Sequence, residues 1–180
     1  MTAPVIGVFG SSRGPFSDDL VRLAVALGKA VAEAGCTLLT GATTGLPFEA
    51  SRGAKEAGGT VLGISPAKDR KDHISGYGMP VEHHDHIIYT GMDYVGRNVI
   101  NVRSCDACVF IHGSVGTLQE FSIAYALEKP IGVLVESGGI TDRLKGIIAG
   151  FDARYAPDVI YDRDQVSLVI NLLASLKKDI

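Results

Sequence analysis

The 180-residue sequence is long enough for one α/β domain with a full hydrophobic core. Hydrophobic residues make up 46% of it and charged residues 21%. The net charge is −3 and the sequence has no block of like charges, which argues against a nucleic-acid polymer or an anionic membrane as partner. No apolar run reaches 18 residues and the N-terminus leads directly into a predicted strand, so we expect no membrane span, no signal peptide and a cytoplasmic location.

Strands and helices alternate along the first third of the chain, where apolar residues recur at strand or helix spacing and Ser17, Gly35 and Pro47 mark helix ends. The predicted elements are a strand at 5–9, a helix from Ser17 to about 34, a strand at 36–39, a helix from Pro47 to about 57 and a strand at 60–64. Short right-handed crossovers between such units give a parallel sheet. We therefore predict an α/β fold: a three-layer, Rossmann-like parallel sheet with helices on both faces.

Residues 65–86 interrupt this alternation with prolines, glycines and most of the histidines. A loop of this length is usually functional or mobile. His83, His84 and His86, with the neighbouring carboxylates, could ligate a metal, but good metal sites draw their ligands from fixed elements. We therefore predict no metal site and a polar loop near the mouth of a pocket.

The second half of the chain resumes the alternation and contains neither an internal repeat nor a linker, so we predict a single nucleotide-binding domain over residues 1–180. The predicted elements are a strand at 87–89, a helix at 93–103, a strand at 107–111, a helix from about 115, a strand at 131–135, a short helix from Thr141, a strand at 159–161 and a helix from Asp164 to about 177.

Cys105 and Cys108 form a C-x-x-C pair, and with Cys36 they are too few for a disulfide framework. A redox pair of this kind normally opens a helix after a strand. Here the pair lies between the end of a predicted helix and the start of a buried strand, which favours packing of small side chains over redox chemistry.

Residues 107–120 join an apolar strand, a turn with Gly113 and Gly116, and a helix expected to begin near Val115. Glycines let the backbone approach a ligand closely, and the free N–H groups and positive dipole end of the helix point to the same place. The segment therefore predicts an anion site, for which phosphate is the natural ligand. Glu120 follows one helical turn further along.

The same residues also allow a purely structural interpretation. Thr117 and Glu120 have the spacing of a capping box, in which each side chain satisfies an N–H group at the start of the helix. Strand–glycine–helix turns are common in α/β proteins of every function. From this segment alone, phosphate binding and structural capping are both open.

Glycine-rich turns follow three of the predicted strands, and in a parallel sheet such turns lie at one edge, where ligands bind at the switch in strand order. The candidate phosphate- or nucleotide-binding residues are Gly10, Ser11, Ser12, Gly41, Thr43, Gly45, Gly113, Ser114, Gly116 and Thr117. The first turn lacks the third glycine of G-x-G-x-x-G, so a mononucleotide fits better than a dinucleotide. The absence of a G-x-x-x-x-G-K-[ST] motif argues against a P-loop ATPase.

Over nearly its whole length the chain resembles the LOG-type, "lysine decarboxylase-like" proteins of the Rossmann-like nucleotide-binding group. Their first strand, which ends in G-S-S, is similar to residues 8–12, and their G-G-G-x-x-G-L-M motif is similar to residues 41–47. Their P-G-G-x-G-T-x-x-E motif is similar to residues 112–120, and the arginine of their R-K pair falls on Arg97.

The best-known members of that family hydrolyse the N-glycosidic bond of nucleoside 5′-monophosphates to release the base and ribose 5-phosphate. The resemblance therefore implies catalytic roles for Arg97 and Glu120 and a phosphate-binding role for the G-x-G-T turn. Arg97 could either hold the 5′-phosphate or position Glu120 by a bidentate pair. It implies a phosphate-bearing small molecule as ligand, no resident cofactor, and a homodimer or higher homo-oligomer.

The motifs of this chain also depart from the family pattern. His112 and Ser114 replace a proline and a glycine, Ala42 and Thr43 replace two glycines, and Asn98 replaces the lysine. In these and other segments the chain looks more like a divergent branch that includes relatives of the molybdenum-cofactor carrier protein. That branch implies an alternative function, the non-catalytic binding or carriage of a nucleotide or of molybdopterin, so the sequence leaves open whether the protein is an enzyme.

Overall fold

A seven-stranded parallel sheet with the order β4-β3-β2-β1-β5-β6-β7 forms the centre of the computed structural model, which describes residues 2–151 and 157–176. The strands are β1 (Val5–Gly10), β2 (Thr37–Thr40), β3 (Val61–Ser65), β4 (His86–Tyr89), β5 (Ala107–Ile111), β6 (Ile131–Leu134) and β7 (Val159–Asp162). Every strand pairs in parallel with its neighbours, and the α/β Rossmann-like fold predicted from the sequence is confirmed.

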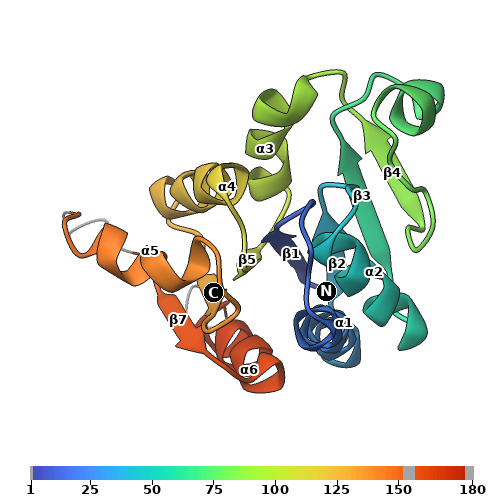
Figure 1. The fold of residues 1–180 in the computed structure, drawn as a ribbon. Coiled ribbons are helices and arrows are strands. Elements are labelled where there is room, and N and C mark those ends of the chain that lie inside the picture. Colours follow the sequence, from blue (N-terminus) through green and yellow to red (C-terminus); the bar gives the residue numbers. More distant parts are fainter. Residues whose placement is uncertain (1, 152–156, 177–180) are drawn as a thin grey trace.

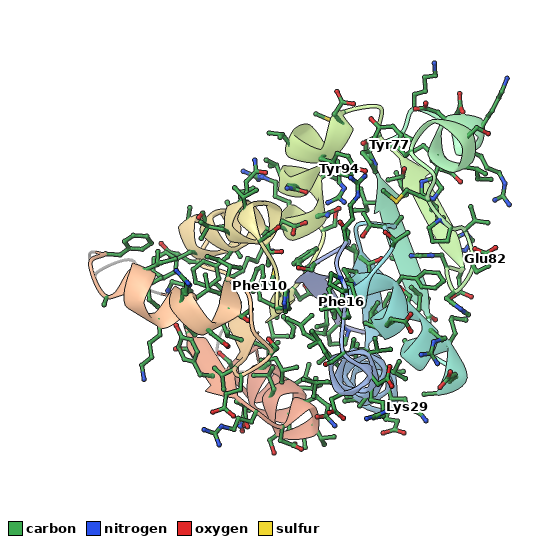
Figure 2. The ribbon with its side chains drawn as sticks, in the orientation of Figure 1. Phe16, Lys29, Tyr77, Glu82, Tyr94 and Phe110 are labelled. Carbon is green, nitrogen blue, oxygen red and sulfur yellow. The ribbon has the colours of Figure 1, made fainter. Side chains whose placement is uncertain are left out.

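Helices cover both faces of this sheet (Figure 1). They are α1 (Asp18–Glu33), α2 (Leu46–Glu56), α3 (Asp93–Arg103), α4 (Val115–Ala126), α5 (Thr141–Ile148) and α6 (Gln165–Leu176). One apolar core joins α1, α2 and α6 to one face, and a second joins α3, α4 and α5 to the other. Phe110 of β5, which lies next to the central strand β1, is fully buried in the second core (Figure 2).

The order of the strands reverses beside β1. The chain runs outward from β1 through β2 and β3 to β4, and then returns to place β5 on the other side of β1. The turns that follow β1 and β5 therefore diverge to opposite faces of the sheet and leave a crevice between them, which is the usual ligand position in open α/β sheets.

Two glycines bring α1 and α2 into backbone contact on one face of the sheet. A Cβ atom on Gly28 would lie 1.8 Å from the carbonyl oxygen of Ala50, and one on Gly53 would lie 2.0 Å from that of Val25. Neither position has room for a side chain. This close packing fixes α2, which follows the turn after β2, against α1.

The local signals identified most helix ends. Ser17 caps α1 as expected, because its Oγ accepts a hydrogen bond from the N–H of Leu20 at 3.2 Å. The predicted ranges of α3 and β5 match the structure, and most other bounds differ by one residue. The expected end of the last helix at residue 177 lies outside the described residues. Within the described ranges, no helix combines the length and the apolar character needed to cross a membrane.

The segment between β3 and β4 contains a short π-helix, η1 (Asp72–Gly76), that the sequence pattern did not indicate. It is organised around the fully buried ring of His73. Nδ1 of His73 lies 2.8 Å from Oγ of Ser65, and its Nε2 lies 2.9 Å from the carbonyl oxygen of Pro80. Since a carbonyl only accepts, Nε2 carries the proton and Nδ1 accepts from the serine.

The C-x-x-C pair lies where the sequence placed it, with Cys105 after α3 and Cys108 inside β5, and both thiols are free and buried. The Sγ of Cys105 donates to the carbonyl oxygen of Asn101 at 3.1 Å. A hydrogen bond with Cys108, together with burial, raises the pKa of the Cys105 thiol well above its ordinary value. A protonated, buried thiol is unreactive, which agrees with a packing role.

Candidate functional site at the switch in strand order

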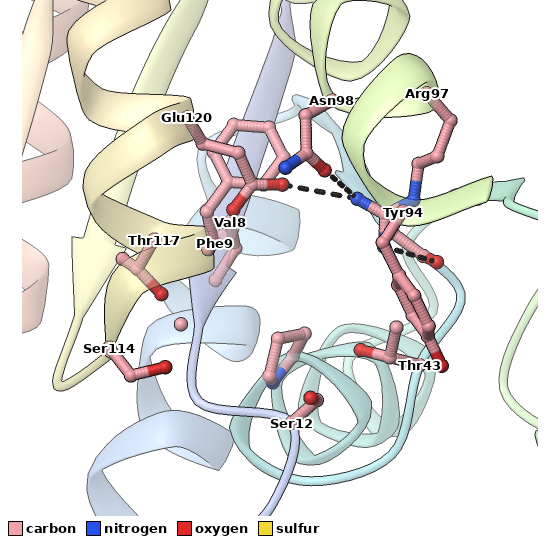
Figure 3. Close-up of a pocket in the computed structure, with 14 residues that line it drawn as sticks. Val8, Phe9, Ser12, Thr43, Tyr94, Arg97, Asn98, Ser114, Thr117 and Glu120 are labelled. Atoms are coloured by element: carbon pink, nitrogen blue, oxygen red, sulfur yellow. Dashed lines mark hydrogen bonds and ion pairs between the residues drawn. The ribbon is translucent and has the colours of Figure 1, made fainter. Parts of the chain in front are cut away.

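A pocket of about 160 Å³ lies at the carboxyl edge of the sheet, where the strand order reverses (Figure 3). The turns after β1, β2 and β5 all reach it, and these are the three glycine-rich turns that the sequence predicted to meet at one edge of the sheet. Residues of α3 also line it. The residues that line it are Val8, Phe9, Gly10, Ser12, Gly41, Thr43, Pro47, Tyr94, Arg97, Asn98, Ser114, Gly116, Thr117 and Glu120.

The N-terminus of α4 forms one wall of the pocket. Gly113 has a φ of +92°, and a Cβ there would lie 2.5 Å from the side chain of Thr117, so only glycine fits this turn. The side chain of Ser114, the N-cap residue, makes no capping bond to the helix. The first N–H groups of α4 are therefore available to an anion, which the positive end of the helix dipole also favours. Gly116 lines the pocket here, and a Cβ on it would meet no protein atom within 4 Å.

The capping-box interpretation of this segment is wrong. The helix begins two residues before Thr117, so Thr117 lies inside it and is not the N-cap. The carboxylate of Glu120 accepts hydrogen bonds from α3 instead of turning back to its own helix: Oε1 lies 3.2 Å from Nη1 of Arg97 and 3.1 Å from Nδ2 of Asn101. The motif thus joins two helices at a pocket.

Arg97 and Glu120 form an ion pair with side chains that are only 5% and 8% exposed. Burial raises the pKa of Glu120, while the charge of Arg97 and the bonds from Asn101 and Arg97 act in the opposite direction. Burial likewise lowers the pKa of Arg97, and Glu120 counteracts this. Each charge therefore offsets part of the cost of burying the other.

The guanidinium of Arg97 is held on three sides. Its Nη1 also donates to Oδ1 of Asn98 at 2.5 Å, and its Nη2 donates to the carbonyl oxygen of Gly41 at 3.2 Å. A Cβ on Gly41 would lie 2.2 Å from Nη2, so the arginine reaches the turn after β2 only because this residue is glycine. Nδ2 of Asn98 donates to Oε1 of Gln119 at 2.9 Å, which extends the network to α4.

Two polar atoms in this network make no hydrogen bond with the described residues: Nε of Arg97 and Oδ1 of Asn101, both buried. Arg97 and Glu120 are also the only charged residues among those that line the pocket, and their charges cancel. An anionic ligand would therefore be held mainly by N–H and hydroxyl groups of the turns, because the pocket carries no surplus cation.

The structure brings most of the predicted site residues together. Those that line the pocket are Gly10, Ser12, Gly41, Thr43, Arg97, Ser114, Gly116, Thr117 and Glu120, whereas Ser11, Gly45 and Gly113 do not line it. Ser11 turns to His112, with its Oγ 2.9 Å from Nδ1 of that ring. Gly45 has a φ of +74° and packs so closely on the turn after β1 that a Cβ would lie 2.5 Å from the carbonyl oxygen of Ser11.

Two residues of α3 belong to the site but were not singled out from the sequence. Tyr94 and Asn101 stand three residues before and four residues after Arg97, so all three project from one face of the helix. Tyr94 lines the pocket and Asn101 contacts Glu120. Once Arg97 was a candidate, this helical spacing was the signal that would have pointed to both.

The histidine-rich segment is tied to its surroundings by other bonds. The Nε2 of His84 lies 3.2 Å from Oγ1 of Thr40, and its Nδ1 lies 2.9 Å from the carbonyl oxygen of Glu82. Asp85 forms an ion pair with Lys55 at 2.7 Å and accepts from the N–H of Val61. In the part of the chain that the structure describes, no three His, Cys, Asp or Glu side chains are grouped as metal ligands.

Comparison with known proteins extends over nearly the whole chain. The sequence model of the SLOG cluster4 family matches residues 3–168. A protein of Archaeoglobus fulgidus is 35% identical over 129 residues, which cover 72% of this chain and 78% of that protein. Among solved structures, that of TM1055 has a TM-score of 0.82 at 28% identity and covers 95% of this chain and 98% of its own.

Two further structures are of proteins named for the molybdenum cofactor. The molybdenum cofactor binding protein from Rippkaea orientalis is 29% identical, and the molybdenum cofactor carrier protein from Chlamydomonas reinhardtii is 30% identical. Each has a TM-score of 0.78, and each alignment covers 98% of this chain and 99% of the other. These matches agree with the similarity to the carrier branch that the sequence motifs indicated.

Proposed function

The chain belongs to the SLOG cluster4 family, and we propose that it binds a small molecule consisting of a heterocycle and a single phosphate, either a nucleoside monophosphate or the molybdenum cofactor. The observation that carries this proposal is the uncapped N-terminus of α4, which opens into the pocket at Ser114, Gly116 and Thr117. Backbone N–H groups at such a helix end form a ready site for phosphate.

The electrostatics of the pocket support one phosphate and not a chain of them. The only lining cation, Arg97, is already paired with Glu120. The pocket also has no lysine beside this arginine, because Asn98 occupies that position and bonds to Gln119. A diphosphate or triphosphate would bring several negative charges into a pocket that has no further cation to balance them.

The molybdenum cofactor enters the proposal because two of the similar structures carry it in their names. The donor set fits its phosphate as well as that of a nucleotide, since both would meet the same turns. A carrier needs no reacting group, and the departures from the hydrolase motif at Asn98 and Ser114 agree with binding alone.

Thermal unfolding and calorimetry with AMP, GMP, the molybdenum cofactor and inorganic phosphate test this proposal. We expect one of the three organic ligands to bind and to raise the unfolding temperature far more than phosphate does. Thr117→Val should weaken that binding, and Ser122→Ala, an exposed position on the same helix, should not. If no ligand binds, or if Thr117→Val binds as the native chain does, the phosphate position is wrong.

Hydrolysis of the N-glycosidic bond of a nucleoside monophosphate, the LOG-type reaction, is a second candidate function. The observation that favours it is the orientation of Glu120, which lines the pocket and uses Oε1 for both of its bonds to α3, leaving Oε2 without a bond to any described residue. A carboxylate beside the ribose would stabilise an oxocarbenium-like transition state or activate water. Arg97 would orient this carboxylate.

Release of free base and ribose 5-phosphate from AMP or GMP, followed by chromatography, decides between the two candidates. In the hydrolase, Glu120→Gln abolishes release but preserves binding. In the carrier, the native chain releases no base while it binds the ligand. Release that continues at the native rate in Glu120→Gln would exclude this residue as the catalytic group.

We also propose that the protein is a cytoplasmic homodimer whose chains each form one domain. Met92, the N-cap residue of α3, and Val95 and Val99 within this helix are exposed at spacings of three and four residues, and exposed Val115 begins α4. Such an apolar stripe at helical spacing suits the helix of a second copy. Free cysteines suit a reducing compartment. Sedimentation should give twice the chain mass, and Val95→Glu should return the monomer.

A further inference from the structure

Tyr94 forms the wall of the pocket that faces the N-terminus of α4. Figure 3 shows its ring on the opposite side of the pocket from Ser114 and Thr117, and the contact between Arg97 and Glu120 bridges the two sides. The tyrosine is the only aromatic residue besides Phe9 that lines the pocket, and Phe9 is buried in the core. The pocket thus has a polar wall suited to an anion and an aromatic wall across from it.

The ring of Tyr94 lies against Tyr77, from the segment between β3 and β4, and near Arg97 of its own helix. It meets the ring of Tyr77 edge-on, with centroids 5.5 Å apart and an interplanar angle of 75°, and Figure 2 shows the two residues next to each other. The hydroxyl of Tyr77 donates to Oδ1 of Asp93 at 2.5 Å, a bond that raises the pKa of Tyr77 to about 12. The guanidinium carbon of Arg97 lies 6.0 Å from the centroid of Tyr94.

The backbone at this point is constrained as well. Gly91 and Asp93 both have positive φ angles, +63° and +53°, which an aspartate adopts only at a cost. This turn starts α3 at the position that directs Tyr94 toward the pocket. Tyr77 follows η1, so the long segment between β3 and β4, whose role the motifs left unexplained, braces the aromatic wall.

The volume of the pocket indicates which part of a ligand the wall formed by Tyr94 contacts. Its volume of about 160 Å³ is below the roughly 300 Å³ at which pockets for complete small-molecule ligands begin. A phosphate and a sugar-sized group fill such a space, and a planar heterocycle attached to them must then lie at the mouth. Tyr94 is 37% exposed at that mouth, so part of its ring is open to a ligand.

We propose that Tyr94 is the stacking subsite for the heterocycle of the ligand, and that the ligand lies with its phosphate at the start of α4 and its ring against Tyr94. This inference rests on the proposed function and deepens it, because it assigns the two ends of the ligand to two walls. The bond between heterocycle and sugar then lies near Glu120 and Arg97. The subsite recognises a flat ring by its π-face, so it accepts purine and pterin rings alike.

A comparison of AMP with ribose 5-phosphate by calorimetry tests the subsite, because the second ligand lacks only the ring. Loss of one base–aromatic stack corresponds to a roughly 5- to 150-fold loss of affinity. We expect Tyr94→Leu to lower the affinity for AMP by that factor and to leave the affinity for ribose 5-phosphate within about twofold of the native value. Tyr94→Phe, which keeps the ring, should bind AMP almost as the native chain does. Tyr125→Leu, a tyrosine outside the pocket, serves as matched control.

Fluorescence gives a second readout. The chain contains six tyrosines and no tryptophan, so its emission comes from tyrosine. AMP should quench part of this emission in the native chain and in Tyr125→Leu, but not in Tyr94→Leu, and ribose 5-phosphate should quench none. A tyrosine that merely shapes the protein would not separate the two ligands in this way.

The possible outcomes are distinct. If the native chain binds neither AMP nor ribose 5-phosphate, nucleotide binding is excluded as the function, and with it the stacking of a nucleotide base on Tyr94. If the native chain binds both ligands with equal affinity, or Tyr94→Leu loses both equally, the phosphate site stands and the stacking subsite is overturned. If Tyr94→Leu loses affinity for AMP but not for ribose 5-phosphate, and Tyr94→Phe keeps the native affinity for AMP, the phosphate end of the ligand lies at α4 and the ring end at Tyr94.

Discussion

Arg97 of α3 and Glu120 of α4 form a buried ion pair, with Nη1 and Oε1 3.2 Å apart, at the wall of the pocket. The pair joins two helices that cover the same face of the sheet, and it bridges the polar wall of the pocket on α4 and the aromatic wall on α3. Because each charge is buried, removing one of them leaves the other uncompensated and destabilises the fold. The same contact therefore couples the stability of the fold to the geometry of the site.

Removal of one partner should reveal that coupling. Arg97→Met leaves the carboxylate of Glu120 buried without its cation, and we expect unfolding to become easier by about 3–5 kcal/mol in urea titrations at pH 7. The double variant Arg97→Met, Glu120→Gln should recover part of this loss. If the double variant is as unstable as the sum of the two single variants, the ion pair does not account for the loss.

The pH dependence of Arg97→Met gives an independent check. The pKa of Glu120 is already raised by burial, and the loss of Arg97, which opposes that shift, raises it further. A carboxyl whose pKa is higher in the folded state than in the unfolded state destabilises the fold increasingly as the pH rises. The stability deficit of Arg97→Met should therefore be largest at neutral pH and shrink as the pH falls toward 5. A deficit that does not change with pH would contradict this account.

His84 should make the native chain less stable in mild acid. Burial lowers its pKa below the ordinary value of 6.5. Its Nε2 faces Oγ1 of Thr40, and its Nδ1 donates to the backbone carbonyl oxygen of Glu82. As the pH falls, His84 takes up its proton in the unfolded chain before it does so in the folded chain. The stability that neutral His84 contributes is therefore complete above pH 6.5 and is lost as the pH falls through that value toward the folded pKa. Between pH 7 and 5, His84→Gln should reduce the slope of stability against pH by at most about 1.4 kcal/mol per unit. Equal slopes in urea titrations would disprove the role of His84.

The architecture was predictable because it depends on patterns that are local in sequence. β5 is a continuous apolar run and all its side chains are buried, so its bounds followed from composition alone. The contact between Arg97 and Glu120 had no such signal, because 23 residues separate them and only the folded sheet brings α3 against α4. The sequence supplied the two residues but left open whether Arg97 holds the phosphate or positions Glu120, and the folded chain places its guanidinium against that carboxylate.

Ser11 and Tyr94 show the same limit at the level of single side chains. Ser11 belongs to a glycine- and serine-rich turn at the ligand edge, yet its hydroxyl turns to His112 because the ring nitrogen of that residue offers a partner 2.9 Å away. Tyr94 belongs to no motif, and its position depends on the ring of Tyr77 from a distant segment. Which way a side chain of a turn points is decided by tertiary contacts that sequence spacing does not encode.

Gly116 and Gly41 provide a matched pair that separates ligand contact from folding. A Cβ on Gly116 meets no protein atom, so Gly116→Ala should keep the unfolding free energy within about 0.5 kcal/mol of the native value. The added methyl projects at the pocket wall, where it displaces the phosphate, and the ligand affinity should fall at least about tenfold, or 1.4 kcal/mol. Gly146→Ala on α5 is also open and lies away from the pocket, so it should change neither quantity.

Gly41→Ala should behave in the opposite way, because its Cβ would lie 2.2 Å from Nη2 of Arg97 and no space is free for it. The arginine has to leave its place between Gly41 and Glu120, and overpacking of this kind costs about 1–3 kcal/mol of stability. Urea titration and calorimetry on the three alanine variants measure both quantities. A stable Gly116→Ala chain with native affinity would remove the N-terminus of α4 from the site, whereas a Gly41→Ala chain of native stability would show that the arginine has another conformation available.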